Sequence, residues 1–350
     1  EDSSNNIWIG TFNGGLYQYI PDQDTCVFYD YLRDGIASNF ISTISEDVNG
    51  NALIGTWGGG ITRINKDGLI TFNLSNGLPD TKIRRMLTDA EGNILIGTNE
   101  HGLSIFKGDE FISYTQEDGL INPQIWAVLE DKRGEYWFGT NDGITIYNPL
   151  KKENIQFRNF FKLTGERIRM IKEDSHGRIW IGTDNQGVFT FIPEGNIFTY
   201  EAILNSYISS LVVTALETDN NGGVWTGTLD GLIHYDFNTR NADYFTQTSG
   251  IAGNEITALH FDNQNRLWIG SKGSGITCYS NKQFLIPNLN ETFTPTSFIL
   301  DNNGLLWIGT EAHGILVFDP ATEKIVRSLT EEDGILANLI NIVNVDNYNN

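Results

Sequence analysis

The chain has 350 residues, of which 44 are acidic and 23 basic, so its formal net charge is −21. A surface this acidic repels nucleic-acid phosphates and anionic lipids, which argues against nucleic-acid and membrane-surface binding. A hydrophobic content of 39% with 12% aromatic residues excludes a disordered chain and fits one rich in strands. No apolar run reaches the roughly 20 residues of a transmembrane helix. We therefore expect any export signal or membrane anchor to lie outside this chain.

In chain order, residues 1–6 predict a turn, and a strand follows at Trp8. The segment that begins there occurs eight times in all: WIGTFNGGLYQY from Trp8, LIGTWGGGITRI from Leu53, LIGTNEHGLSIF from Leu95, WFGTNDGITIY from Trp137, WIGTDNQGVFTF from Trp180, WTGTLDGLIHY from Trp225, WIGSKGSGITCY from Trp268 and WIGTEAHGILVF from Trp307. Equivalent glycines are 39 to 45 residues apart. This period is typical of propeller blades.

One repeat, residues 39–74, shows what each copy forms. Apolar runs of four to seven residues alternate with clusters of Asn, Asp and Gly, which predicts four strands with a turn after each. The first strand is apolar three and six residues before its closing Asp, as at Ile44 and Ile41. Because strand faces alternate with period two, this spacing predicts apolar groups on both faces. We predict an all-β propeller of four-stranded antiparallel blades.

The turn after each first strand carries an Asp followed by Gly or Asn, as in EDVNG from Glu46 and DNNG from Asp301. The Asp carboxylate can accept hydrogen bonds from its own turn, and Gly or Asn tolerates positive φ. The bidentate glutamate that closes an EF-hand loop is missing, so we predict neither a metal nor a cofactor.

The last predicted strand, residues 339–346, has no following strand of its own repeat. We expect it to pair with the strand at Trp8 and complete the first blade. Residues 1–350 would then form a single domain with eight blades. The alternative is a seven-bladed ring plus part of a second propeller.

The recurring pattern, with D-G-[IL] before the first strand and W-I-G-T after the acidic turn, resembles the two-component regulator propeller repeat. The resemblance covers essentially the whole chain. It implies the periplasmic sensor region of a membrane-bound hybrid histidine kinase, anchored through segments outside this chain, and an oligosaccharide ligand. The expected partners are the rest of the receptor and a second receptor copy.

Residues that depart from the repeat are candidates for a binding site. Trp57 lies in a turn, and Trp126 lies on a first strand five residues before its closing Asp. Cations and an amide gather at this offset and two residues earlier in three successive repeats, and the neighbouring turns add polar groups. The predicted ligand-binding residues are Trp57, Lys82, Arg84, Glu100, His101, Gln124, Trp126, Asn141, Asp142, Arg167, Arg169, Asp184 and Asn185. Alternatively, the long side chains only cover neighbouring blades or pair with acids.

Aromatic planes and arginines suit a sugar, whose C–H faces stack and whose hydroxyls or carboxylate accept hydrogen bonds. The cationic bias favours an acidic or sulfated glycan. No nucleophile or zinc motif occurs, so we predict no enzymatic activity; any kinase activity would lie outside this chain. A protein-interaction or dimerisation platform and a propeller-type polysaccharide lyase or glycoside hydrolase remain as alternatives.

Overall fold

The computed structural model describes residues 2, 5–107, 110–149, 158–160, 163, 165–194, 197–203, 210, 212–289, 291–331 and 338–344. These residues form eight four-stranded sheets with antiparallel strand pairs. In the described part, helices are limited to single 3-10 turns such as η1 (Pro21–Gln23), η2 (Leu74–Asn76), η3 (Gln116–Asp118) and η5 (Gln247–Ser249). The predicted fold class, an all-β propeller with eight four-stranded blades, is confirmed.

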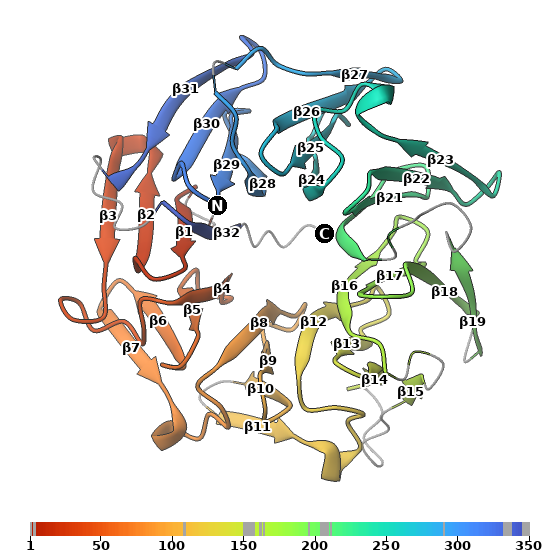
Figure 1. Ribbon diagram of the computed structural model, residues 1–350. Coiled ribbons are helices and arrows are strands. Elements are labelled where there is room, and N and C mark those ends of the chain that lie inside the picture. Colours follow the sequence, from red (N-terminus) through yellow and green to blue (C-terminus); the bar gives the residue numbers. More distant parts are fainter. Residues whose placement is uncertain are drawn as a thin grey trace. The chain divides into compact units, whose positions relative to one another are not determined.

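The chain divides into two compact units. Unit 1 comprises residues 1–128 and 296–350. Its sheets are, in hydrogen-bonding order, β3 (Thr25–Tyr29), β2 (Leu16–Ile20), β1 (Ile7–Thr11) and β32 (Ile340–Asn344); β4 (Ile41–Glu46), β5 (Ala52–Thr56), β6 (Ile61–Asn65) and β7 (Gly68–Phe72); β11 (Glu110–Tyr114), β10 (Leu103–Lys107), β9 (Ile94–Thr98) and β8 (Ile83–Thr88); and β28 (Pro295–Leu300), β29 (Leu306–Thr310), β30 (Ile315–Asp319) and β31 (Lys324–Leu329). Figure 1 shows β32 beside β1, although the two strands come from opposite ends of the chain.

Unit 2 comprises Leu129–Pro295, and the unit boundaries fall within β12 and β28. Its sheets are β12 (Ile125–Glu130), β13 (Tyr136–Thr140), β14 (Gly143–Tyr147) and β15 (Arg158–Phe160); β16 (Ile168–Glu173), β17 (Ile179–Thr183), β18 (Val188–Glu194) and β19 (Ile197–Ile203); β20 (Val213–Thr218), β21 (Gly223–Thr228), β22 (Leu232–Asp236) and β23 (Asn241–Phe245); and β24 (Ile256–Phe261), β25 (Leu267–Ser271), β26 (Gly275–Ser280) and β27 (Gln283–Leu285).

The acidic turns are built as their residues predict. In the turn after β4, the Asp47 carboxylate accepts hydrogen bonds from the backbone amides of Asn49 and Asn51 at 2.9 and 3.0 Å. In five of the six repeats that carry the tryptophan, the same carboxylate also accepts from the indole N–H. These pairs are Trp8 with Asp2, Trp137 with Asp131, Trp180 with Asp174, Trp268 with Asp262 and Trp307 with Asp301. Each turn is thereby tied to the core of its own sheet.

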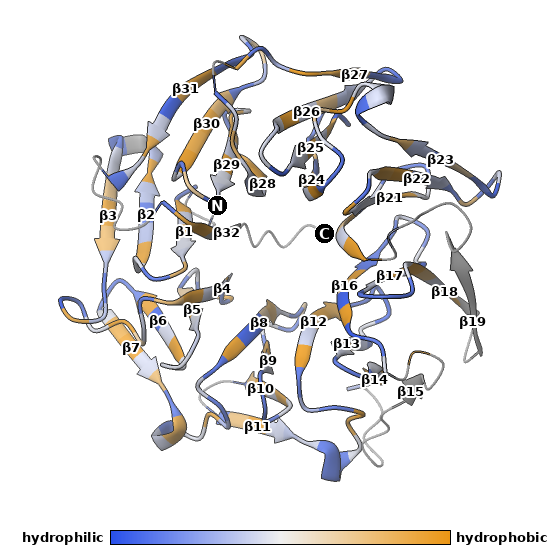
Figure 2. Cartoon of the chain, viewed as in Figure 1, coloured by the Kyte–Doolittle hydropathy of each residue, from blue (hydrophilic) through white to orange (hydrophobic). Residues whose placement is uncertain are grey.

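The tryptophans also pack between adjacent sheets, as their position in the repeat predicts. Trp8 of β1 lies in one buried cluster with Ile41 and Ile54 of the next sheet. Trp225 of β21 contacts the ring of Tyr279 in β26, with the ring centroids 4.8 Å apart. Figure 2 shows the alternation of hydrophobic strand segments and hydrophilic connecting turns that this packing requires.

The first strand of the repeat contains a bulge that its sequence did not reveal. Ile41 pairs with Thr56 and Thr43 with Gly55, so Ser42 is an extra residue between them. The same shift occurs in β8, β16, β20 and β24. Because one extra residue lies between them, Ile41 and Ile44 point to the same face, and both belong to the buried cluster that contains Trp8. The prediction that these apolar positions occupy both faces was therefore wrong.

None of the helical segments among the described residues has the length and apolarity that a bilayer crossing requires.

Candidate functional site

Three of the predicted site residues meet in one pocket of unit 1. The pocket has a volume of about 690 Å³ and takes residues from several sheets. Its lining residues are Phe12, Phe40, Ser42, Trp57, Arg84, Arg85, Trp126, Thr296 and Ser297. We call it the arginine pocket. Trp57, Arg84 and Trp126 come from successive repeats, and the structure brings them together as the sequence predicted.

The bulge in β8 explains why two consecutive arginines line this pocket. In a regular strand, neighbouring side chains point to opposite faces. In β8, Ile83 pairs with Thr98 and Arg85 with Gly97, so Arg84 is the extra residue. A bulge of this kind redirects a side chain, and it lets Arg84 and Arg85 both reach the pocket.

The Arg84 guanidinium is held by two aromatic rings and an amide. Its Cζ atom lies 3.6 Å from the ring centroid of Trp126 and 5.0 Å from that of Trp57. Its Nη2 donates a hydrogen bond to Asn99 Oδ1. Cation–π contacts fix the plane of the guanidinium, and stacked arginines keep in-plane donors for a carboxylate or hydroxyl.

The other side chains of the pocket supply apolar surface and hydroxyl groups. The rings of Phe12 and Phe40 are 3.9 Å apart at their centroids, and Phe12 is 44% exposed. Ser42, Thr296 and Ser297 add hydroxyls. This combination suits a ligand with apolar faces and hydrogen-bonding edges, the general chemistry of a sugar.

Arg85 differs from Arg84 in its contacts. Its side chain is exposed in the pocket and forms no hydrogen bond or ion pair with any described residue. Desolvation by the surrounding protein lowers the pKa of Arg85. The Arg85 side chain is therefore open to solvent on one side, while protein atoms on its other sides desolvate it.

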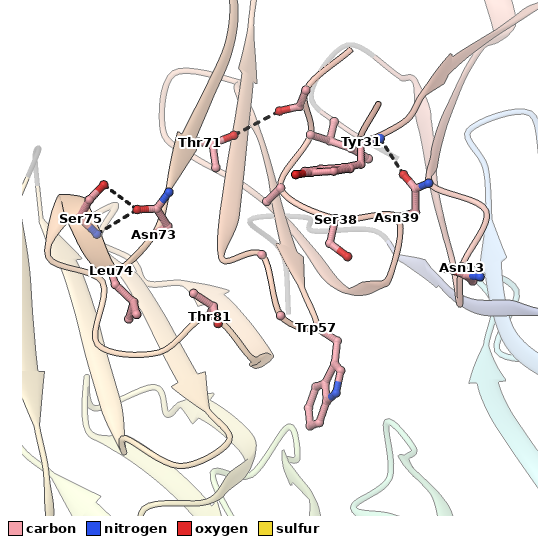
Figure 3. A pocket seen from close by; sticks show the side chains of 15 residues that line it. Asn13, Tyr31, Ser38, Asn39, Trp57, Thr71, Asn73, Leu74, Ser75 and Thr81 are labelled. Atoms are coloured by element: carbon pink, nitrogen blue, oxygen red, sulfur yellow. Dashed lines mark hydrogen bonds between the residues drawn. The ribbon is translucent and has the colours of Figure 1, made fainter. Parts of the chain in front are cut away.

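A second and larger cavity, about 970 Å³, adjoins the first in that Trp57 lines both. We call it the asparagine cleft, because Asn13, Asn39 and Asn73 line it. In the view of Figure 3, Ser38 lies between Trp57 and Tyr31. Its amides are engaged in local structure. Asn39 Oδ1 accepts from the Tyr31 amide at 2.7 Å, and Asn73 caps η2 by accepting from the Ser75 amide. These bonds give the asparagines a structural role.

The remaining predicted residues of unit 1 lie in the turns near Trp57. Residue Trp57 forms an isolated antiparallel bridge with Lys82, whose Nζ lies 3.5 Å from Glu100 Oε1. His101 Nδ1 lies 3.3 Å from Asp80 Oδ2. The backbone N–H of Gln124 donates to Asn122 Oδ1 at 2.9 Å. None of these four residues, Lys82, Glu100, His101 and Gln124, lines the arginine pocket.

The other predicted residues belong to unit 2, where the arginines pair with an acid. Arg167 Nη1 lies 3.1 Å from Asp184 Oδ2, and Arg169 Nε contacts Asp184 Oδ1. Arg167 also donates to Asn141 Oδ1 at 2.9 Å. Asp142 accepts from the Gly165 amide, and Asn185 is exposed. The contacts of Arg167 and Arg169 therefore agree with the alternative interpretation, in which the cations pair with acidic residues.

Sequence reasoning missed Phe12, Phe40 and Arg85. Phe40 lies seven residues before Asp47 but is neither a cation nor an amide, and Arg85 lies four residues before Asp89, outside the two offsets at which cations gather. In the other repeats, that offset holds Thr43, Ala127, Met170, Ala215, Ala258, Ser297 and Ile342. A long cation among these residues was a detectable signal. Among the described residues, no group of three or more His, Cys, Asp or Glu is arranged to hold a metal ion.

The family model described as "two component regulator propeller" matches residues 119–142, 162–185 and 250–273. These matches fall on three of the eight repeats, and the predicted resemblance to this family is confirmed.

A curated relative and two solved structures are also similar. "Histidine kinase P4" of Formosa agariphila is 26% identical over 156 residues, which are 43% of this chain and 11% of that protein. The extracellular domain of the putative hybrid two component system BT3049 from B. thetaiotaomicron is 21% identical, with a TM-score of 0.46 over 95% of this chain and 51% of that chain. PorZ, a surface component of the type-IX secretion system of Porphyromonas gingivalis, is 15% identical, with a TM-score of 0.58 over 93% of this chain and 46% of that chain. This chain therefore aligns with only part of each, and the family model and the curated histidine kinase relate it to two-component signalling proteins.

Proposed function

We propose that this chain is the ligand-sensing part of a two-component signalling receptor and binds an oligosaccharide in the arginine pocket. In this proposal, the chain lies in the periplasm, and the receptor is anchored in the membrane through segments outside this chain. The rest of the receptor and a second receptor copy are its partners. Residues 1–350 act as a single domain in this proposal.

One observation supports the proposal above others: the off-motif residues Trp57, Arg84 and Trp126 converge on one cavity of about 690 Å³. That volume falls within the range of small-molecule sites. The repeat itself does not need these residues, because the motif tryptophans already pack the sheets. Side chains that depart from a repeat and gather at one pocket are best explained by a ligand.

The proposed domain is a sensor and performs no chemistry on its ligand. The side chains of the arginine pocket include no carboxylate pair, nucleophile with a base, or histidine. Arginine and indole groups bind and orient a ligand. The signal must then leave as a change in geometry or association, which a ligand produces only through different affinities for two states.

Calorimetry with a panel of neutral, uronate-containing and sulfated oligosaccharides tests the proposal on the 350-residue chain. We expect saturable binding of at least one member. Trp126→Ala and Arg84→Ala should each weaken that binding by at least about 2 kcal/mol, the scale of aromatic and arginine hot spots. Arg33→Ala is the matched control, because Arg33 also stacks on a ring, that of Phe28 at 4.9 Å, but lines neither cavity.

The competing functions give different results in the same samples. Turnover of a panel member would indicate a lyase or hydrolase. A concentration-dependent mass without any saccharide binding would indicate an interaction or dimerisation platform. Unchanged affinity in both the Trp126 and Arg84 variants would place the ligand outside the arginine pocket.

A further inference from the structure

We propose that the ligand of the arginine pocket carries a negatively charged oxygen group, a carboxylate or a sulfate ester, and that Arg85 is the residue that pairs with it. This inference rests on the proposed ligand-binding function and adds the charge of the ligand and the group that recognises it.

The position of Arg85 in the repeat is the first argument. The bulge in β8 places this residue opposite Gly97, and the equivalent residue in β4, Thr43, is 2% exposed. The sheet packing therefore accepts a small side chain at this position. An arginine here contributes little that the packing needs, and its exposed side chain lines the pocket.

The charge around Arg85 is the second argument. The chain carries 44 acidic residues, yet none of the nine residues that line the pocket is acidic. The cations nearby have partners: Arg84 donates to Asn99, and Lys82 lies 3.5 Å from Glu100. Arg85 forms no such contact with the described residues. In so acidic a protein, a guanidinium that faces a cavity without a carboxylate leaves its donors for a group from outside.

The cost of holding this charge is the third argument. Desolvation lowers the pKa of Arg85, which means that its surroundings disfavour the charged form that arginine nevertheless keeps. A bound anion would offset that cost. Arg84 beside it presents a second guanidinium, whose plane is fixed by Trp126. Two forked donors at one site suit an oxyanion better than a neutral hydroxyl.

Matched probes isolate the charge of the ligand. We choose a tetragalacturonate and its carboxyl-reduced counterpart, which share length and linkage, together with a sulfated galacto-oligosaccharide and its desulfated form. Inorganic sulfate, added at constant ionic strength, serves as a probe without sugar. Calorimetry measures the affinity for each saccharide. A shift of the thermal unfolding midpoint reports the binding of sulfate.

Arg85→Met removes the charge and keeps much of the side-chain length, whereas Arg85→Lys keeps the charge. Lys107→Met is the control for net charge in the same unit, because Lys107 is exposed on β10, 3.9 Å from Glu91, and lies outside the pocket. Circular dichroism and the unfolding midpoint confirm that each variant is folded.

We expect one charged probe to bind at least about tenfold more tightly than its neutral partner, the scale of one charge-assisted hydrogen bond. Arg85→Met should lower the affinity for the charged probe to that for the neutral probe. The affinity for the neutral probe should not change. Arg85→Lys should retain part of the preference, and Lys107→Met should retain all of it. Preferred binding of the tetragalacturonate would indicate a carboxylate on the ligand, and preferred binding of the sulfated oligosaccharide would indicate a sulfate ester.

The failures are distinguishable. Equal affinity for charged and neutral probes, unaffected by Arg85→Met, overturns the role of Arg85 and leaves saccharide sensing intact. If no saccharide binds but sulfate raises the midpoint of the wild type and not of Arg85→Met, saccharide sensing fails and the anion site stands. If sulfate has no such effect and no saccharide binds, both proposals are wrong.

Discussion

At the residue scale, one side chain makes the stability of the protein depend on pH. Burial lowers the pKa of His260, on β24, below the ordinary histidine value of about 6.5, and the nearby Glu217 carboxylate opposes this shift. The unfolded chain therefore binds a proton at a pH where the folded chain does not. Stability rises with pH wherever the unfolded state binds more protons.

We therefore expect the free energy of unfolding contributed by His260 to be fully present above about pH 6.5, and to fall as the pH decreases below that value. His260→Gln should flatten this part of the profile between about pH 7 and 5. Urea unfolding at several pH values measures it, with His101→Gln as the control for loss of an exposed imidazole. Parallel profiles for wild type and His260→Gln would contradict the assignment.

Residue identities at the candidate site were only partly predictable from sequence. Comparison of equivalent positions in the repeats found Trp57, Arg84 and Trp126, because each departs from the repeat. It could not show that Arg167 and Arg169 share Asp184, since ion pairing depends on side-chain direction. It also missed Arg85, because the bulge at Arg84 changes which neighbours share a surface.

At the scale of the blade, the bond between the turn Asp and the motif tryptophan recurs with one exception. In the sheet of β20–β23, His234 Nε2 lies 3.0 Å from Asp219 Oδ2, and the indole of Trp225 stacks on His234 with centroids 4.2 Å apart. Burial alone would raise the pKa of Asp219. Hydrogen bonds from His234 and from the amides of Gly223 and Asn221 outweigh burial and lower that pKa.

Trp225 is 3% exposed and also contacts Phe245 and Tyr279, so its main role is packing between sheets. Trp225→Ala should lower the free energy of unfolding by about 3–5 kcal/mol, the usual cost of emptying such a site. Trp57→Ala, at a half-buried turn position, should cost less than about 1.5 kcal/mol. Equilibrium denaturation of the two variants compares them. Equal losses would mean that Trp57 is also a packing residue.

The period, the four strands and the acidic turn were predictable because each is local: strand length, alternation and turn residues act within about ten positions. The bulge was not. Two residues opposite one can be recognised only from the partner strand, and a sequence read alone counts Ile41 and Ile44 as lying on opposite faces. Their shared cluster with Trp8 shows the same face.

At the scale of the whole molecule, the pairing of β32 with β1 joins the two ends of the chain within unit 1. Backbone partners include Ile9 with Val343 and Gly10 with Ile342. Ile340 is fully buried in a cluster with Ile9, Tyr17 and Trp307. The fourth strand of the first sheet is therefore contributed from more than 300 residues away. Of the predicted segment 339–346, residues 345 and 346 lie outside the described residues.

This pairing leads to a prediction about truncation. Deleting residues 339–350 removes β32, so β1 becomes an unpaired edge and the cluster around Trp307 loses Ile340. An exposed edge with consecutive apolar residues, here Ile7, Trp8 and Ile9, is a template for pairing with another chain. We expect a lower unfolding midpoint and concentration-dependent aggregation, measured by thermal scans and light scattering. Deleting only residues 345–350 keeps β32 and is the matched control, which should remain soluble. If the longer deletion were equally stable and soluble, the pairing of β32 with β1 would not contribute the stability expected of it.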